Sequence, residues 1–307
     1  MQIYRHLDEV PVLEKPVMTL GTFDGVHLGH QKILARLKEV ARVAGGEVVL
    51  LTFYPHPRKV LFPDKHDLQL INTLEEKIKM LSSQGVQHLI IHPFDEAFSH
   101  LDHETFVREI LVEKLRVNTL VIGYDHQFGR NRKGSFKELT ELAPILNFKV
   151  EEIPEQDIAE VAVSSTRIRK ALHNGEIEIA NELLGYDYSL SGKVVQGKEI
   201  GRTLGYPTAN IQPDDSDKLI PANGIYAVLV DVEGQTFKGA MSIGNRPTFD
   251  NGERSVEVFL IDFNGDLYGK RLTVHFRYFL RPELKFDSVE ALIAQMDKDI
   301  IRCTELL

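Results

Sequence analysis

Two histidines in a glycine-rich turn are the residues of this sequence best suited to chemistry. The stretch Gly21–Gln31 follows the short apolar run Val17–Leu20 and precedes apolar residues with helical spacing, so it is predicted to lead from a buried strand into a helix. His27 and His30 are three residues apart at the start of that helix, where both rings can hydrogen-bond one group. Glycines allow close approach of the backbone, and a helix N-terminus attracts anions. The turn therefore predicts a phosphate site, and two ordinary histidines at a helix start are the weaker alternative.

Two other segments of the first half are expected to lie beside this turn. Strand-like and helix-like patterns alternate here, with strands predicted at 17–20, 47–53, 86–91 and 119–123 and helices through 33–41, 73–83 and 105–115. This alternation predicts a parallel sheet covered by helices, which binds ligands at the carboxyl ends of its strands. Tyr54–Pro57 and Gly123–Gly129 both follow predicted strands. One ligand could therefore touch all three segments.

A third group of polar residues precedes a helical pattern near the end of this half. Ser164 or Ser165 can cap that helix, and the hydroxyls, the free amides and Arg167 would converge on an anion. A capped helix with exposed arginines is the alternative interpretation.

The second half changes from helical to strand periodicity. Short strands are predicted at 189–195, 224–231, 236–243, 255–263 and 271–280, which favours a small closed antiparallel barrel. A helix over 287–303 is expected to pack on the barrel through Val289, Leu292, Ile293 and Met296. The glycines Gly192, Gly197 and Gly201 belong to a loop that could arch over an anion, although it matches no standard phosphate loop.

Three oxygen-bearing side chains in this half suggest a metal and a base. Thr208 and Asn210 alternate along an extended chain, so both can face one side and offer hard oxygen ligands to Mg2+. Glu257 shares a strand face with Phe259 and Ile261. A carboxylate in that position either faces water at an edge or is retained for function.

Composition narrows the class of protein. The chain has 307 residues, 43% of them hydrophobic and 26% charged, which is ordinary for a globular protein with two cores. Its net charge of -9 argues against nucleic acid as a partner. Cys303 is the single cysteine, so an intrachain disulfide is excluded. The charged first residues and the lack of a long apolar run lead us to expect a cytoplasmic protein without a membrane partner. An oligomer is compatible with the sequence but not readable from it.

The motifs resemble those of one enzyme family along essentially the whole chain, in the family order. Residues 21–30 read Gly-x-Phe-Asp-Gly-x-His-x-Gly-His, similar to the first motif of nucleotidyltransferases. Residues 163–169 resemble Ile-Ser-Ser-Thr-x-Ile-Arg, and 123–129 resemble Gly-x-Asp-Phe-x-Phe-Gly with His126 in place of a phenylalanine. Residues 201–210 resemble the riboflavin kinase signature Gly-Arg-x-Leu-Gly-x-Pro-Thr-Ala-Asn, with Tyr206 where phenylalanine is frequent. The chain is thereby identified as similar to bacterial bifunctional riboflavin kinase/FAD synthetases (riboflavin kinase/FMN adenylyltransferases, prokaryotic type).

This resemblance implies an α/β protein of two domains. Residues 1–185 would form a Rossmann-like FMN adenylyltransferase (nucleotidyltransferase) domain, a parallel sheet with helices. Residues 186–307 would form a riboflavin kinase domain, an antiparallel β-barrel with a C-terminal helix. The substrates would be riboflavin, FMN and ATP, with FAD as product and Mg2+ as cofactor.

The resemblance also implies roles for individual residues. His27, His30 and Arg167 would stabilise charge on the α-phosphate of ATP, and Glu257 would be the base for the riboflavin hydroxyl. Thr208 and Asn210 would bind the metal. The residues expected to contact flavin or nucleotide are Gly21, Phe23, Asp24, His56, Pro57, Gly123, Asp125, Ser164, Thr166, Gly192, Gly197, Lys198 and Arg281, of which Asp24, His56, Pro57 and Arg281 would lie toward the flavin.

Two alternatives remain at this point. A cytidylyltransferase-type enzyme would explain His27 and His30 equally well, but not the segment around Thr208 or Glu257. Preference for ATP or CTP would decide between the two. A non-catalytic flavin-binding regulatory module could keep the pockets without turnover, and a test for product formation would separate it from an enzyme.

Overall fold

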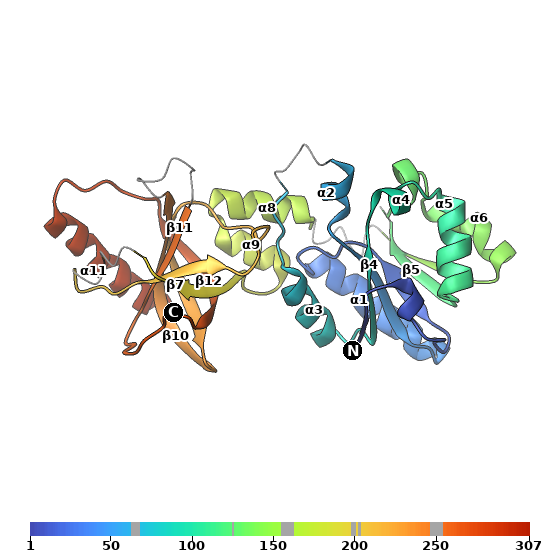
Figure 1. Ribbon diagram of the computed structural model, residues 1–307, viewed down its shortest axis with the longest axis horizontal. Helices are drawn as coiled ribbons and strands as arrows, with labels where there is room; N and C mark the ends of the chain where they lie inside the picture. The colour runs from blue at the N-terminus through green and yellow to red at the C-terminus, as the bar shows by residue number, and fades with distance from the viewer. Residues whose placement is uncertain (63–67, 125, 155–162, 198–200, 202–203, 246–253) are drawn as a thin grey trace. The chain divides into compact units, whose positions relative to one another are not determined.

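The chain folds into two compact units, Met1–Ser164 and Ser165–Leu307 (Figure 1). The structure is a computed structural model that describes residues 1–62, 68–124, 126–154, 163–197, 201, 204–245 and 254–307. Each unit has its own core and is described by itself. The domain boundary predicted after residue 185 concerns function and stays a prediction, whereas the compact units divide after Ser164.

The first unit is built on a six-stranded parallel sheet in the order β1-β4-β3-β2-β5-β6. This confirms the predicted sheet. The two outermost strands were not predicted, because β1 is only three residues long and β6 is mostly polar. In chain order the strands are β1 Gln2–Tyr4, β2 Val17–Leu20, β3 Val48–Tyr54, β4 His88–Pro93, β5 Thr119–Gly123 and β6 Lys149–Ile153.

Helices cover both faces of this sheet (Figure 1). Successive residues of a strand point to opposite faces, so Val17 packs in the core with Leu34 and Met18 packs in the other core with Phe106. The first core includes α1 Leu28–Ala44 and α3 Leu74–Ser83; the second includes η2 Phe106–Lys114 and α6 Phe136–Leu146. The shorter helices are η1 Leu7–Glu9, α2 Pro57–Leu61, α4 Glu96–Ser99, α5 His103–Thr105 and η3 Arg130–Arg132.

The helix starts follow the capping signals of the sequence. The predicted capping box of α3 is present: the backbone N–H of Glu76 donates to the Thr73 hydroxyl at 3.2 Å, and that of Thr73 donates to the Glu76 carboxylate at 2.9 Å. Ser135 starts α6 in the same manner. Gly45 ends α1 with a φ of 62°, a left-handed conformation that suits glycine.

The second unit contains a closed barrel in the strand order β10-β11-β8-β7-β12-β9, with antiparallel neighbours. This confirms the predicted barrel. The short strand β8 was expected only as extended chain, because Pro207 precedes it and Pro213 ends it. The strands are β7 Ser189–Val195, β8 Ala209–Pro213, β9 Gly224–Val232, β10 Gln235–Asn245, β11 Arg254–Leu260 and β12 Arg271–Arg281.

Helices α8 Ser165–Asn174 and α9 Ile177–Leu184 belong to this second unit. The Asn181 side chain of α9 donates to the backbone carbonyl of Phe276 in β12 at 2.8 Å. The same side chain accepts from the backbone N–H of Tyr188 at 2.7 Å. Asn181 thus ties α9 to the barrel at two points.

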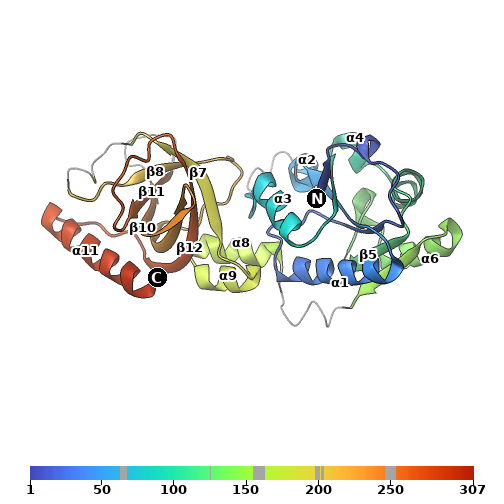
Figure 2. The ribbon, with the colours of Figure 1, turned by 90° about the horizontal axis from the view of Figure 1, so that it is seen from below.

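Helix α11 Val289–Leu306 runs along the outside of the barrel against β9 and β10 (Figure 2). The predicted helix and its packing are confirmed, but the predicted packing face is partly wrong. Val289 is 52% exposed, and the buried residues of α11 are Asp299 and Cys303 near its other end. An apolar pattern could not reveal a buried aspartate.

Candidate active sites

The two histidine rings stack on one another at the start of α1. His27 is the N-cap, and its Nδ1 accepts the backbone N–H of His30 at 3.4 Å. The ring centroids are 3.7 Å apart and the planes differ by 17°. With Nδ1 used as an acceptor, neutral His27 carries its proton on Nε2, which can donate to a ligand. The predicted pairing of the rings is therefore present.

His30 is held in its uncharged form. Burial lowers its pKa well below 6.5, and the nearby His27 and Lys77 lower it further. Among the described residues, its buried Nδ1 has no hydrogen-bond partner. The tautomer with the proton on Nε2 avoids a buried, unpaired N–H at Nδ1, and we assign His30 to it. Both histidines can thus act as Nε2–H donors.

The turn before α1 adopts a conformation that the sequence did not predict. Phe23 and Val26 have φ values of 47° and 33°, in the left-handed region that non-glycine residues rarely occupy. Both side chains are buried, and the Phe23 ring centroid lies 4.6 Å from that of His30. Such strain persists only where surrounding packing imposes it, and it concentrates at functional sites.

Asp24 holds a neighbouring segment in place. Its buried carboxylate accepts backbone N–H groups from Ile71 at 3.1 and 3.3 Å and from Asn72 at 3.3 Å. In addition, the ammonium group of Lys77 donates to the Thr22 carbonyl at 2.8 Å. Sequence reasoning missed Lys77, because a lysine in a charged helical stretch is usually solvated.

The remaining predicted ligands of the first half lie at the carboxyl ends of strands or near them. His56 caps the short helix α2 that begins at Pro57, and its Nδ1 accepts the backbone N–H of Arg58 at 3.2 Å. Gly21 directly follows β2, and Gly123 is the last residue of β5. Asp125 lies outside the described residues.

The segment with Ser164, Thr166 and Arg167 leads into α8, as predicted. All three residues are exposed. Ser164 ends the first unit, whereas Thr166 and Arg167 belong to the second. Their convergence on the two histidines therefore stays a prediction.

In the barrel, the structure brings together the three residues that sequence reasoning singled out. The Thr208 hydroxyl donates to the Glu257 carboxylate at 3.0 Å. Glu257 of β11 is the register partner of Asn210 in β8, so the two side chains share one face of the sheet. Val256, Val258 and Leu260 are the buried residues of β11, which places Glu257 on the half-buried outer face. An acid, a hydroxyl and an amide thus form one cluster.

All three predicted loop glycines are required by close packing, although Gly192 lies within β7; an added Cβ on Gly201 would lie 2.4 Å from the Tyr206 carbonyl. A Cβ on Gly197 would lie 2.1 Å from the Asn210 amide nitrogen, and one on Gly192 would lie 2.3 Å from the Gln212 carbonyl. Any side chain at Gly197 would displace Asn210. Lys198 lies outside the described residues.

A cleft of about 760 Å³ opens next to the cluster. Thr208 lines it, together with the connection between β11 and β12 that includes Phe263 and Tyr268. Its volume is in the range of small-molecule sites. Through Thr208, the cluster therefore borders a space large enough for a ligand.

Comparison with known proteins decides the family. A model described as FAD synthetase matches residues 10–167, and one described as riboflavin kinase matches residues 184–307. The bifunctional riboflavin kinase/FMN adenylyltransferase of Listeria monocytogenes is 42% identical over 284 residues, covering 92% of this chain and 90% of that protein. The protein of that name from Bacillus subtilis is 39% identical, covering 93% and 90%. This chain belongs to the bifunctional riboflavin kinase/FMN adenylyltransferase family.

A solved structure supports the fold over the whole chain. The crystal structure titled macrolide-efflux protein from Streptococcus pneumoniae is 32% identical and covers 97% of both chains with a TM-score of 0.88. The name in that title refers to the Streptococcus pneumoniae protein, and we use the similarity only as support for the fold of this chain. Among the described residues of this family member, no helix is long and apolar enough to cross a membrane.

Arg281 makes a different contact from the one that membership of this riboflavin kinase/FMN adenylyltransferase family suggested. Its guanidinium donates to both carboxylate oxygens of Asp299 in α11, at 2.6 and 3.2 Å to one oxygen and 3.0 Å to the other. The two side chains are only 16% and 10% exposed. Gln295 also donates to Asp299 at 3.0 Å. These contacts support a role for Arg281 as an anchor of α11, and its predicted place near the flavin stays a prediction.

Arg281→Ala is expected to lower the free energy of unfolding of the barrel unit by about 3 kcal/mol, because it leaves Asp299 buried without its partner. Urea unfolding measures this loss. Arg302→Ala on the same helix is the control: its ion pair with Glu305 is exposed, and the loss should stay below about 1 kcal/mol. Equal losses would contradict the anchor.

The lowered pKa of His30 predicts an acid-sensitive first unit. Unfolded His30 takes up a proton near pH 6.5, whereas the folded form does so only at a much lower pH. Between these values the unfolded chain binds more protons, so the free energy of unfolding falls as the pH drops below about 6.5. Urea unfolding between about pH 5 and 7.5 should show this slope, and His30→Gln should reduce it. His100 is exposed, so His100→Gln is the control and should leave the slope unchanged. An unchanged slope in His30→Gln would refute the assignment of this pH dependence to His30.

Proposed function

We propose that the chain makes FAD from riboflavin in two ATP-dependent steps. In the barrel, the γ-phosphate of ATP is transferred to the 5'-hydroxyl of riboflavin, which gives FMN and ADP. In the first unit, a phosphate oxygen of FMN attacks the α-phosphate of ATP, the bond to pyrophosphate breaks, and FAD forms. The observation that carries this proposal is that each family match falls on a stretch with its own candidate phosphate-transfer site.

For the kinase step, Glu257 is the proposed base. Its carboxylate would accept the proton of the riboflavin hydroxyl as that oxygen attacks phosphorus. The hydrogen bond from Thr208 orients the carboxylate. This arrangement uses the hydroxyl proton and leaves the lone pairs of the Thr208 oxygen available.

Mg2+ fits the oxygen donors of this cluster. The Thr208 hydroxyl and the Asn210 side-chain carbonyl are hard neutral ligands, and the Glu257 carboxylate lies next to them. Thr208 and Asn210 would hold the ion, which would supply neutralisation of phosphate charge.

For the adenylyl step, positioning and electrostatics suffice. The Nε2–H groups of His27 and His30 would donate to the oxygens of the α-phosphate, and the amides at the start of α1 would add partial positive charge. Arg167 would contribute a third donor. No covalent enzyme intermediate is needed.

The ligand contacts assigned by family membership complete the proposal. In the adenylyltransferase site, the flavin would contact Asp24, His56 and Pro57, while Gly123, Asp125, Ser164 and Thr166 would contact the adenine nucleotide. In the kinase domain, Arg281 would lie near the flavin. The hydrogen bonds of Asp24 with the Ile71 amide and of Arg281 with Asp299 also support an indirect role, through the loop and the helix that these two residues hold in place. The functional boundary after residue 185 belongs to the same proposal.

Incubation of the purified protein with riboflavin, ATP and Mg2+, followed by separation of the flavins, tests both steps. FMN should accumulate first and FAD second, and EDTA should stop both. Replacement of ATP by CTP tests the cytidylyltransferase alternative. Unchanged riboflavin would overturn the proposal in favour of a binding module.

A further inference from the structure

Lys77 is a buried lysine that none of the functional assignments above uses. It lies in the first turns of α3 and is only 7% exposed. Burial of an ammonium group is costly unless it is paired or hydrogen-bonded. Its Nζ donates to the backbone carbonyl of Thr22 at 2.8 Å, in the turn that carries the two histidines. Ionisable side chains that are buried at such a cost in free energy are concentrated at functional sites.

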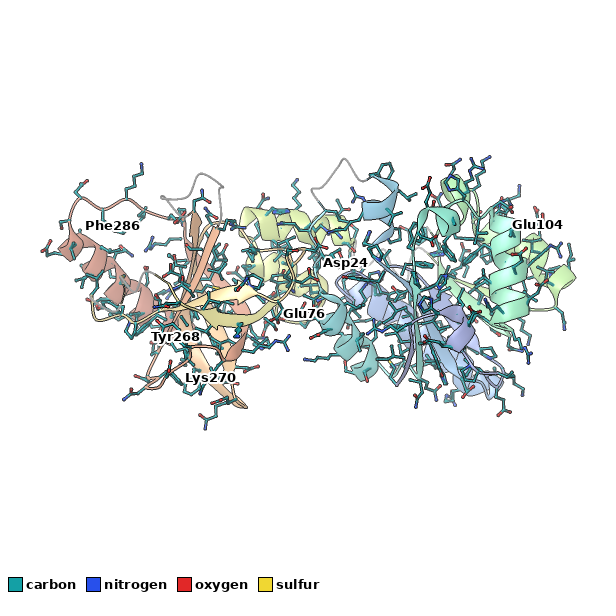
Figure 3. The ribbon with its side chains drawn as sticks, in the orientation of Figure 1. Asp24, Glu76, Glu104, Tyr268, Lys270 and Phe286 are labelled. Carbon is teal, nitrogen blue, oxygen red and sulfur yellow. The ribbon has the colours of Figure 1, made fainter. Side chains whose placement is uncertain are left out.

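Hydrogen bonds in both directions connect the Thr22–Asp24 turn with the start of α3. Lys77 reaches from α3 to Thr22, and Asp24 reaches from the turn to the amides of Ile71 and Asn72, just before α3 begins. Gly25 packs so closely that an added Cβ would lie 3.1 Å from the Ile71 side chain. In Figure 3, the label Asp24 marks the turn and the label Glu76 marks the start of α3. Movement of α3 would therefore move the turn.

The charge of Lys77 also acts on the histidine pair. Burial lowers the pKa of Lys77, and the negative charge of Asp24 opposes this. Burial lowers the pKa of His30, and His27 and Lys77 add to that effect. The groups facing Lys77 are thus one carboxylate, one histidine with its stacked partner, and the Thr22 carbonyl, which also accepts from the Thr52 hydroxyl at 3.3 Å.

We propose that Lys77 is a positioning residue of the adenylyl-transfer site, which fixes the strained Thr22–Asp24 turn through the Thr22 carbonyl and presents a buried positive charge to His30. This rests on the proposed adenylyltransferase function. In the proposed reaction, Lys77 contacts neither the phosphate of FMN nor the α-phosphate of ATP. Its charge adds to the burial that keeps His30 uncharged, and its hydrogen bond keeps the two Nε2–H donors in place for the α-phosphate.

Two substitutions separate the hydrogen bond from the charge. Lys77→Met removes both, and Lys77→Gln keeps a donor but removes the charge. The kcat for FAD formation from FMN should fall roughly 10- to 100-fold in Lys77→Met, the cost of a slightly misplaced site, and less in Lys77→Gln. Riboflavin phosphorylation in the barrel should stay unchanged and reports an intact chain.

The titration of His30, followed by NMR of labelled histidine, is the decisive reading because it does not need turnover. Its midpoint should move to higher pH in both variants, and the acid limb of the FAD-forming rate should move in the same direction. Thr52→Val is the matched control, because it removes the other donor to Thr22 without changing any charge. Its His30 midpoint should equal that of the unmodified protein.

Two outcomes would overturn the proposal. An unchanged His30 midpoint in Lys77→Gln would remove the electrostatic role, and an unchanged kcat in Lys77→Met would remove the positioning role. If the unmodified protein formed no FAD, the proposed function would fail, while the titration would still test the electrostatic effect of Lys77 on His30.

Discussion

Replacement of His30 by alanine is expected to lower FAD formation from FMN by roughly 100- to 1000-fold, the usual cost of one preorganised donor to a developing charge. The ring stacks on that of His27 at the start of α1, and burial lowers its pKa, so His30 would act as a neutral hydrogen-bond donor. FMN formation from riboflavin should continue at the native rate, because the barrel has its own cluster around Glu257. Separation of flavins after incubation with FMN or with riboflavin measures both rates.

His100→Ala is the matched control, since this histidine is exposed in the same unit and should affect neither rate. Circular dichroism of His30→Ala would verify that the unit remains folded. A parallel loss of both activities in a folded variant would contradict the assignment of the two reactions to separate sites.

The phosphate turn could be predicted from sequence because its signals are local. A buried strand, glycines and a helical pattern stand next to one another around His27 and His30, and each reflects short-range backbone preference. The positive φ values of Phe23 and Val26 could not be predicted, because packing from distant segments imposes them. The same holds for Lys77, whose partner Thr22 is 55 residues away.

In the barrel, too, the local patterns could be predicted from the sequence, whereas the contacts between distant segments could not. Alternating apolar residues predicted its strands, and Thr208, Asn210 and Glu257 do form one cluster. The role of Arg281 could not be inferred, because its partner Asp299 lies in a helix whose apolar pattern suggested another packing face. Polar anchors between distant elements leave no periodic signal.

Tyr206 illustrates how a departure from the family pattern gains meaning from structure. Its ring packs edge-on against Phe259 with centroids 5.7 Å apart, which a phenylalanine could also do. Its hydroxyl donates to Asp297 of α11, which a phenylalanine could not. The segment that leads to Thr208 is therefore tied to α11, the helix that Arg281 also anchors. Through Asp297 and Asp299, α11 thus holds both the segment before the proposed metal ligands and the end of β12.

Glu257→Gln is expected to lower riboflavin phosphorylation by roughly 100- to 10,000-fold, the range for loss of a general base. The amide oxygen of glutamine can still accept the Thr208 hydroxyl, so the local structure should persist while basicity is lost. FAD formation from supplied FMN should remain native, because that reaction is assigned to the other unit. With riboflavin as substrate, both FMN and FAD should therefore disappear together.

Glu233→Gln separates this effect from a general loss of negative charge on the barrel. Glu233 lies in the turn between β9 and β10 and pairs with Lys270 while 67% exposed, so its replacement should leave both reactions unchanged. Retention of native kinase turnover by Glu257→Gln would remove this carboxylate from the mechanism and leave the Thr208 contact as its only role.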